Sequence, residues 1–185
     1  MARLTPADYK RMYPNTRVEG LEQVIVNLNR ELEGIKSRSV KGLVLSAAMI
    51  RRETETVPPL TPVDLGNLRA SWFVVSASVR AGGGNKSFKG KKASEMELDH
   101  TSTLEEAQAI VRAGSGKDRQ FVILGYSARY GIYVHENLGM HDPGNPYWKN
   151  KKWRPGSGPK WLQQAIDRNR GRILQIVRDN AKIGK

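Results

Sequence analysis

The strongest constraint on the fold is a long stretch of apolar residues at helical spacing that ends at two prolines. Between residues 20 and 54, leucine, isoleucine and valine recur every three or four positions, which is the period of one helix face. Gly34 and Gly42 weaken this helix, and Pro58 and Pro59 stop it. The stretch predicts either one helix of roughly 50 Å or two helices with a bend. A helix of this length in a small domain usually crosses a sheet or reaches a neighbouring subunit.

Composition excludes several classes of protein. The chain has 185 residues and no cysteine, which excludes a disulfide framework, a thiolate metal site and a cysteine nucleophile. It has no run of about 18 apolar residues, so we expect no transmembrane helix. Residues 1–14 lack the apolar stretch of a secretory signal. The length fits one domain with extensions.

The chain is strongly basic. Lys and Arg number 31 against 18 Asp and Glu, which gives a formal net charge of +13. The charge is concentrated in residues 149–185, where only Asp167 and Asp179 are acidic. Such a surface favours an anionic partner, either DNA or an acidic protein, although it can also simply keep the protein soluble. The candidate contacts for DNA or an acidic partner are Lys149, Lys151, Lys152, Arg154, Arg168, Arg170 and Arg172.

The remaining elements are short. The sequence predicts strands at 72–79 and 120–126, a helix at 103–113, a strand or short helix at 130–136, and a final helix at 159–181. Thr103 and Glu106 fit a capping box at the start of the 103–113 helix. Pro159 suits the first turn of the final helix.

This order of elements predicts an α+β fold. We expect a small antiparallel β-sheet packed by the long N-terminal helix and the C-terminal helix, with the helices on one face and with long loops. Residues 1–19 are expected to form an N-terminal arm, and residues 20–185 a single α+β domain. Residues 81–118 are expected to be a flexible insertion, because 81–100 have no period and are rich in glycine and lysine.

Candidate catalytic residues are few. His135, Glu136, His141 and Asp142 lie close together in the sequence and are of types that bind metals. Their spacing matches no helical zinc motif, and the alternative is that His135 and Glu136 fix the neighbouring loop by hydrogen bonds. No serine lies in a nucleophile elbow, and the glycine-rich stretches lack the ending of a phosphate-binding loop. We therefore expect no enzyme activity and no cofactor. A metal-dependent hydrolase that uses these four residues is kept as a less favoured hypothesis for function.

The tryptophans suggest an interface. Trp148 and Trp153 lie among lysines in a loop rich in Pro and Gly. Such aromatic residues stack on bases in proteins that bind single strands, but tryptophan is also favoured at protein interfaces. We expect these two side chains to lie at an interface. Trp161 lies on the apolar face of the final helix and is expected in the core.

Three segments carry a family resemblance. Residues 61–71, TPVDLGNLRAS, are similar to the P-x-D-T-G-x-L-R-x-S signature of the tail-completion, or head–tail joining, proteins of long-tailed bacteriophages. Residues 130–137, YGIYVHEN, resemble that family's Y-A-x-Y-V-H/E-E segment. Residues 158–165, GPKWLQQA, resemble its K-F-L-x-x-A helix start. Leu65 departs from the pattern, because the family usually carries Thr at this position.

The motif residues are interpreted as a scaffold for a corner between a loop and a strand. Gly66 permits a backbone angle that other residues avoid, and Asp64 can accept hydrogen bonds from the backbone there. Arg69 is expected to begin a strand and to pair with Glu136. The structural residues of the motif are Pro62, Asp64, Gly66, Leu68, Arg69, Ser71, Tyr133 and Glu136.

The resemblance implies a structural protein of the virion neck, assembled in the host cytoplasm. Copies would form a ring, hexameric to match the tail, that joins the DNA-filled head and its connector to the tail or completes the tail. The implied partners are the adaptor and stopper proteins, the tail terminator or tail tube, and DNA that passes through the lumen without sequence specificity; no membrane is implied. The alternative is a basic nucleic-acid-binding module that uses the C-terminal helix.

Overall fold

A computed structural model describes residues 6–12, 20–78, 80–82, 88–114, 120–139 and 154–183. Its elements in chain order are α1 (Pro6–Met12), α2 (Leu21–Thr56), α3 (Asn67–Ala70), β1 (Trp72–Val75), β2 (Arg80–Gly82), α4 (Ala93–Gly114), β3 (Ile123–Tyr126), α5 (Gly131–Glu136) and α6 (Trp161–Ala181). The strands form an antiparallel sheet in the order β2-β1-β3. The predicted α+β class, with a small sheet packed by a long N-terminal and a C-terminal helix, is confirmed.

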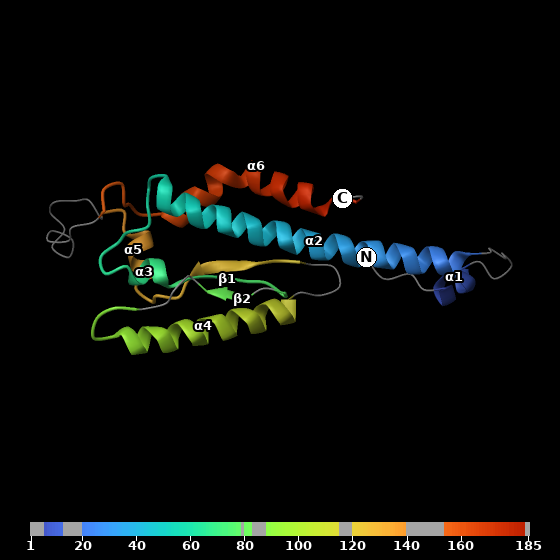
Figure 1. Cartoon of the computed structure of the whole chain (residues 1–185), viewed down its shortest axis with the longest axis horizontal. Helices are drawn as coiled ribbons and strands as arrows, with labels where there is room; N and C mark the ends of the chain where they lie inside the picture. Colours follow the sequence, from blue (N-terminus) through green and yellow to red (C-terminus); the bar gives the residue numbers. More distant parts are fainter. Residues whose placement is uncertain are drawn as a thin grey trace.

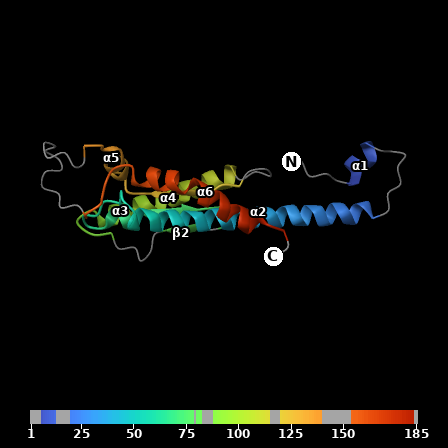
Figure 2. The ribbon, with the colours of Figure 1, turned by 90° about the horizontal axis from the view of Figure 1, so that it is seen from above.

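Helix α2 dominates the shape of the molecule. It is one continuous helix of 36 residues, about 54 Å long at 1.5 Å per residue, so the alternative with two helices is wrong. Its C-terminal half packs against α6 and the sheet, and its N-terminal half runs past both, with α1 beside its far end (Figures 1 and 2). Gly42 permits the close approach of α6, because a Cβ atom there would lie 2.9 Å from Cα of Val177.

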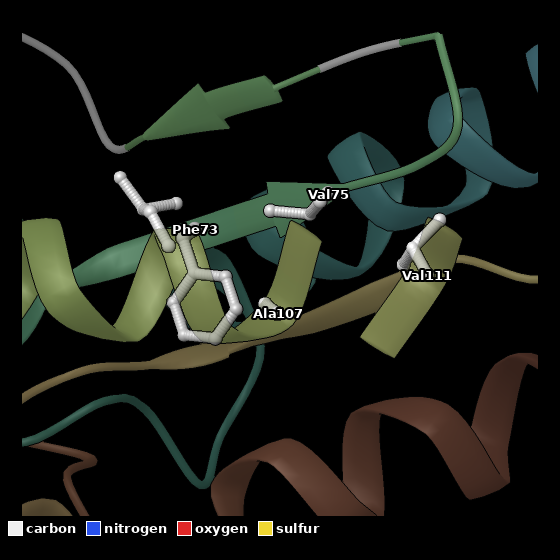
Figure 3. Packing of buried hydrophobic residues seen from close by; sticks show 5 residues of the cluster. Phe73, Val75, Ala107 and Val111 are labelled. Carbon is white, nitrogen blue, oxygen red and sulfur yellow. The ribbon is translucent and has the colours of Figure 1, made fainter. Parts of the chain in front are cut away.

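The sheet is covered on both faces. Side chains of a strand alternate between faces, and all four residues of β1 are buried. Trp72 and Val74 pack with Ala47 of α2 on one face. Phe73 and Val75 pack against α4 on the other (Figure 3). The expectation that all helices lie on one face is therefore wrong, because α4 supplies a second layer with the buried side chains Leu104, Ala107 and Val111.

Helix α4 lies inside the segment that the sequence predicts to be a flexible insertion. It begins at Ala93 rather than at residue 103, so the predicted capping box is wrong. Thr103 instead lies in mid-helix, where its hydroxyl donates a hydrogen bond to the carbonyl of Asp99, 2.7 Å away. Most side chains in the first turns of α4 face solvent and are polar. These turns therefore show no sustained series of apolar residues at helical spacing.

The other element boundaries differ less. Strand β1 ends at Val75, short of the predicted 72–79. Residues 130–136, for which the sequence predicts either a strand or a short helix, contain helix α5. Pro159 lies before α6 rather than in its first turn. Lys160, the residue directly before the helix, has a left-handed backbone conformation with φ of 57°. Within the arm at 1–19, α1 forms a helix of seven residues.

Candidate functional site

The three segments that carry the resemblance meet at one end of the molecule. Leu68 of α3, Val134 of α5 and Trp161 of α6 form one buried cluster together with Ala128. Trp161 is 1% exposed, so its predicted place in the core is confirmed. Gly131 permits close packing of α5, because a Cβ atom there would lie 3.1 Å from Cδ1 of Leu68. We call this region, built by α3, α5 and the start of α6, the motif corner.

Local backbone chemistry explains how the corner begins. Gly66 precedes α3 with φ of 89°, a conformation that glycine adopts without a steric penalty. Ser71 closes α3: its hydroxyl donates to the carbonyl of Leu68 at 2.8 Å, and its N–H donates to the carbonyl of Asn67 at 2.9 Å. Pro62, Leu68 and Ser71 are buried, so these three members of the predicted motif lie in the interior of the fold.

A hydroxyl cluster holds the preceding loop to the end of α2. Thr54 and Thr61 each lie within hydrogen-bond distance of the Tyr126 hydroxyl, at 3.2 and 3.1 Å. The N–H of Thr61 also donates to the carbonyl of Thr54 at 2.8 Å. No pattern in the sequence predicts this cluster, because Tyr126 lies 72 and 65 residues along the chain from Thr54 and Thr61.

The predicted ion pair between Arg69 and Glu136 is wrong. Arg69 lies in α3 rather than at the start of a strand, and its Nε atom lies 2.6 Å from Oε2 of Glu55 on α2. Arg154 approaches the same carboxylate at 3.4 Å and donates to the Glu55 carbonyl at 2.8 Å. Glu55 lies in the last turn of α2, and the loop at 57–66 brings α3 with Arg69 back to it.

Glu136 instead pairs with the residue that precedes α6. Its carboxylate accepts hydrogen bonds from Lys160 and from Nδ1 of His135, and these bonds, that from Lys160 foremost, hold the pKa of Glu136 below its usual value. The His135 ring packs edge-on against Trp161, with centroids 4.7 Å apart. The alternative in which His135 and Glu136 fix the chain by hydrogen bonds therefore matches this geometry.

The structure brings no metal ligands together among the residues that it describes, where no group of three histidine or carboxylate side chains gathers. His135 and Glu136 are neighbours in space. His141 and Asp142, the other two members of the proposed metal set, lie outside the described residues. The metal hypothesis therefore keeps only one pair of ligands that can be placed.

Three of the four predicted basic contact residues that the structure describes form ion pairs within the chain. Arg154 pairs with Glu55, as above. Arg168 donates to the carbonyl of Pro58 at 2.8 Å and lies 3.4 Å from Glu53, and Arg170 pairs with Asp167 at 2.7 Å. Arg172 is exposed and forms no ion pair with any described residue. Lys149, Lys151 and Lys152 lie outside the described residues, as do Trp148 and Trp153.

The outer surface of the motif corner is apolar. Tyr133 is 75% exposed, and Ile132 beside it on α5 is 65% exposed. Leu138 follows the helix and is also exposed, as is Leu65 before α3. Tyr133 was expected to be a structural residue of the motif, but its side chain makes the surface rather than the core.

A hollow opens beside the motif corner, between α3, the segment at 88–92, the start of α4 and the loop before α5. Its volume is about 450 Å³. Asn67 builds one wall, because its side-chain amide donates to the carbonyl of Lys89 at 2.9 Å and accepts from the Lys89 N–H at 2.8 Å. Tyr130 also lines the hollow; burial, together with the nearby carboxylate of Asp64, raises the pKa of Tyr130 to about 12. The hollow was not predicted, because it depends on a contact between residues 67 and 89.

Comparison of the chain with protein-family models, with curated proteins and with solved structures gives no match. Among the described helices, none is both long and apolar enough to cross a membrane.

Proposed function

We propose that the chain is a structural, non-enzymatic subunit of a bacteriophage neck, one copy in a ring that joins the DNA-filled head and its connector to the tail or completes the tail. The observation that carries this proposal is the meeting of the three resembling segments around Leu68, Val134 and Trp161. Matches that arise by chance along a sequence have no reason to pack on one another. Their common corner supports a single inherited structural unit.

The surface of the chain suits association with further copies. Val24 and Leu28 lie one turn apart on one face of α2 and are exposed on the half of this helix that runs past the sheet (Figure 1), and Ile132 and Tyr133 are exposed on α5 at the other end. Contiguous exposed apolar surface marks interaction sites. Two different surfaces at opposite ends favour head-to-tail contacts, which close into a ring when the rotation allows. Six copies would match the six-fold symmetry expected of the tail.

The proposed location is the virion neck, after assembly in the host cytoplasm. The proposed neighbours are the adaptor and stopper proteins on one side and the tail terminator or tail tube on the other. The net charge of +13 suits acidic neighbours or a lumen through which DNA passes without sequence-specific contacts. The alternative, a nucleic-acid-binding module on α6, is not favoured by the ion pairs that Arg168 and Arg170 of this helix form within the chain.

Mass photometry of the purified full chain tests the proposal. We expect a closed oligomer of one discrete mass, and we expect Tyr133→Asp to convert it to monomers by placing a charge in the contact. Leu174→Asp is the matched control, since Leu174 is an exposed apolar residue of α6, away from both surfaces. Oligomers that survive Tyr133→Asp would remove α5 from the contact.

The same measurement with duplex DNA at low and physiological salt tests the alternative. A monomer that binds DNA tightly at physiological salt would replace the neck proposal. In that case, alanine at Arg168, Arg170 and Arg172 would reduce the dependence of affinity on salt, because each lost phosphate contact lowers the log–log slope by about 0.9.

A further inference from the structure

The hollow beside the motif corner has the form of a binding site. Its volume of about 450 Å³ lies within the range of about 300–1,000 Å³ that is typical of ligand pockets. Its apolar lining comes from four separate parts of the chain and consists of Leu65, Phe88, Met96, Ala128 and Tyr130. Exposed apolar surface in a concave setting binds an apolar group well, because both surfaces leave water.

The walls of the hollow are held by specific contacts. Asn67 holds the backbone of Lys89 by two hydrogen bonds. Phe88 is buried and packs edge-on against His100, with ring centroids 5.9 Å apart. Nδ1 of His100 lies 2.7 Å from the hydroxyl of Ser127, which also lines the hollow. A site that is already formed loses little conformational entropy when it binds.

The rim of the hollow carries an excess of positive charge. Arg129 pairs with Asp99 at 2.7 Å, and Lys92 lies 3.9 Å from Glu95. Lys89 and Lys91, also on the rim, form no ion pair with any residue that the structure describes. After these pairings, two ammonium groups remain beside an apolar floor.

We propose that this hollow binds an acidic segment of another protein, one that presents an apolar side chain between carboxylates. The apolar side chain enters the hollow against Leu65, Phe88 and Met96, and the flanking carboxylates pair with Lys89 and Lys91. Charge complementarity selects the occupant: the chain itself carries +13, so a second copy is repelled more than an acidic partner. A DNA duplex is disfavoured because it presents a regular line of phosphates to a protein surface and has no apolar side chain to fill the floor formed by Leu65, Phe88 and Met96.

This inference rests on the hollow alone and does not require the neck proposal. A chain that forms rings but binds no acidic peptide would keep the neck proposal and lose this one. A chain that binds the peptide as a monomer would do the reverse.

Fluorescence anisotropy of labelled peptides on the full chain tests the inference. The probe is the peptide EDLFDE at physiological salt. We compare it with EDSSDE, which lacks the apolar pair, and with KKLFKK, which inverts the charge. We expect EDLFDE to bind at least tenfold more tightly than either, because only EDLFDE has both apolar side chains for the hollow and carboxylates for Lys89 and Lys91. No binding of EDLFDE, or equal binding of EDSSDE, would overturn the proposal.

Variants locate the peptide on the chain. Lys91→Glu reverses a rim charge and Met96→Glu places a carboxylate in the floor; we expect each to weaken EDLFDE about tenfold or more. Lys41→Glu is the matched control, since Lys41 is exposed on α2 and does not line the hollow, and we expect less than a twofold effect. Circular dichroism verifies that each variant is folded.

The outcomes separate the possible occupants. Equal weakening by Lys41→Glu and Lys91→Glu would mean general charge attraction and would overturn the proposal. Displacement of EDLFDE by a DNA duplex, lost in Lys91→Glu, would assign the hollow to nucleic acid instead. Displacement by unlabelled chain would assign it to a second copy.

Discussion

Arg69 and Glu55 form an ion pair between α3 and the last turn of α2, with the guanidinium Nε 2.6 Å from the carboxylate Oε2. Arg154 adds a second guanidinium to the same carboxylate. The Glu55 side chain is 13% exposed, so one nearly buried carboxylate joins α2, α3 and the segment before α6. The corner is therefore fastened to the long helix by charge as well as by the apolar cluster around Trp161.

The first prediction concerns this carboxylate. Glu55→Gln leaves two arginines beside a neutral amide, and we expect it to lower the free energy of unfolding by about 1–2 kcal/mol, because the arginines remain partly solvated. Urea unfolding measures the change. Glu136→Gln is the matched control: its carboxylate bonds to Lys160 and His135 at the surface, so we expect a smaller loss. A larger loss for Glu136→Gln would contradict the assignment of Arg69 to Glu55.

The second prediction separates the two leucines of the motif. Leu68 is 4% exposed and lies in the cluster with Val134 and Trp161, so we expect Leu68→Ala to cost about 2–4 kcal/mol through lost contacts and a cavity. Leu65 is 55% exposed, and Leu65→Ala should change stability by no more than about 0.5 kcal/mol. Thermal unfolding of both variants gives the comparison. Similar losses for the two would mean that Leu65 is buried in an oligomer.

The elements of the fold were largely predictable where one face of a helix is apolar over many turns. The stripes of α2 and α6 have this property, and both helices lie close to their predicted ranges. Helix α4 does not: its buried residues begin only at His100, so its first two turns have no amphipathic signal. The same polar composition is typical of a loop, and only packing against the sheet distinguishes the two.

The candidate site was less predictable because it depends on contacts between distant residues. Gly66 carries a local signal, since glycine permits its positive φ. The partner of Arg69 has no such signal, because a sequence of many glutamates does not show that Glu55, rather than Glu136, lies beside Arg69 in the fold. The two hydrogen bonds between Asn67 and the backbone of Lys89 require the segment at 88–92 to lie against α3. No pattern in the sequence predicts this contact.

The third prediction tests the packing of α2 against α6 with two glycines. A Cβ atom on Gly42 would lie 2.9 Å from backbone Cα of Val177, whereas a Cβ atom on Gly171 would meet nothing within 4 Å. We expect Gly42→Ala to destabilise by about 1–3 kcal/mol, because the helices must move apart. Gly171→Ala should stabilise by about 0.5–1 kcal/mol through helix propensity. Chemical unfolding distinguishes the two signs, and a stabilising Gly42→Ala would contradict the close approach.

The fourth prediction concerns alkaline pH. Burial, with the nearby Asp64 carboxylate, raises the pKa of Tyr130 from 10.0 to about 12, so the folded chain holds this phenol proton more tightly than the unfolded chain does. Its contribution to stability is then complete below about pH 10 and is lost as the pH rises towards about 12. The loss is smaller than the full shift implies, since Tyr130 is 42% exposed and solvent screens the charge.

Tyr130→Phe removes this titration. We expect the variant to lose less stability than the wild type between about pH 10 and pH 12, and we expect the ultraviolet absorbance of tyrosinate to lose the step near pH 12 that Tyr130 contributes. Tyr133→Phe is the matched control, because the Tyr133 ring is largely exposed on α5, and it should follow the wild type. If Tyr130→Phe and the wild type lost stability in parallel, the phenol would not be desolvated at the edge of the hollow, and the apolar lining assigned to Tyr130 would be wrong.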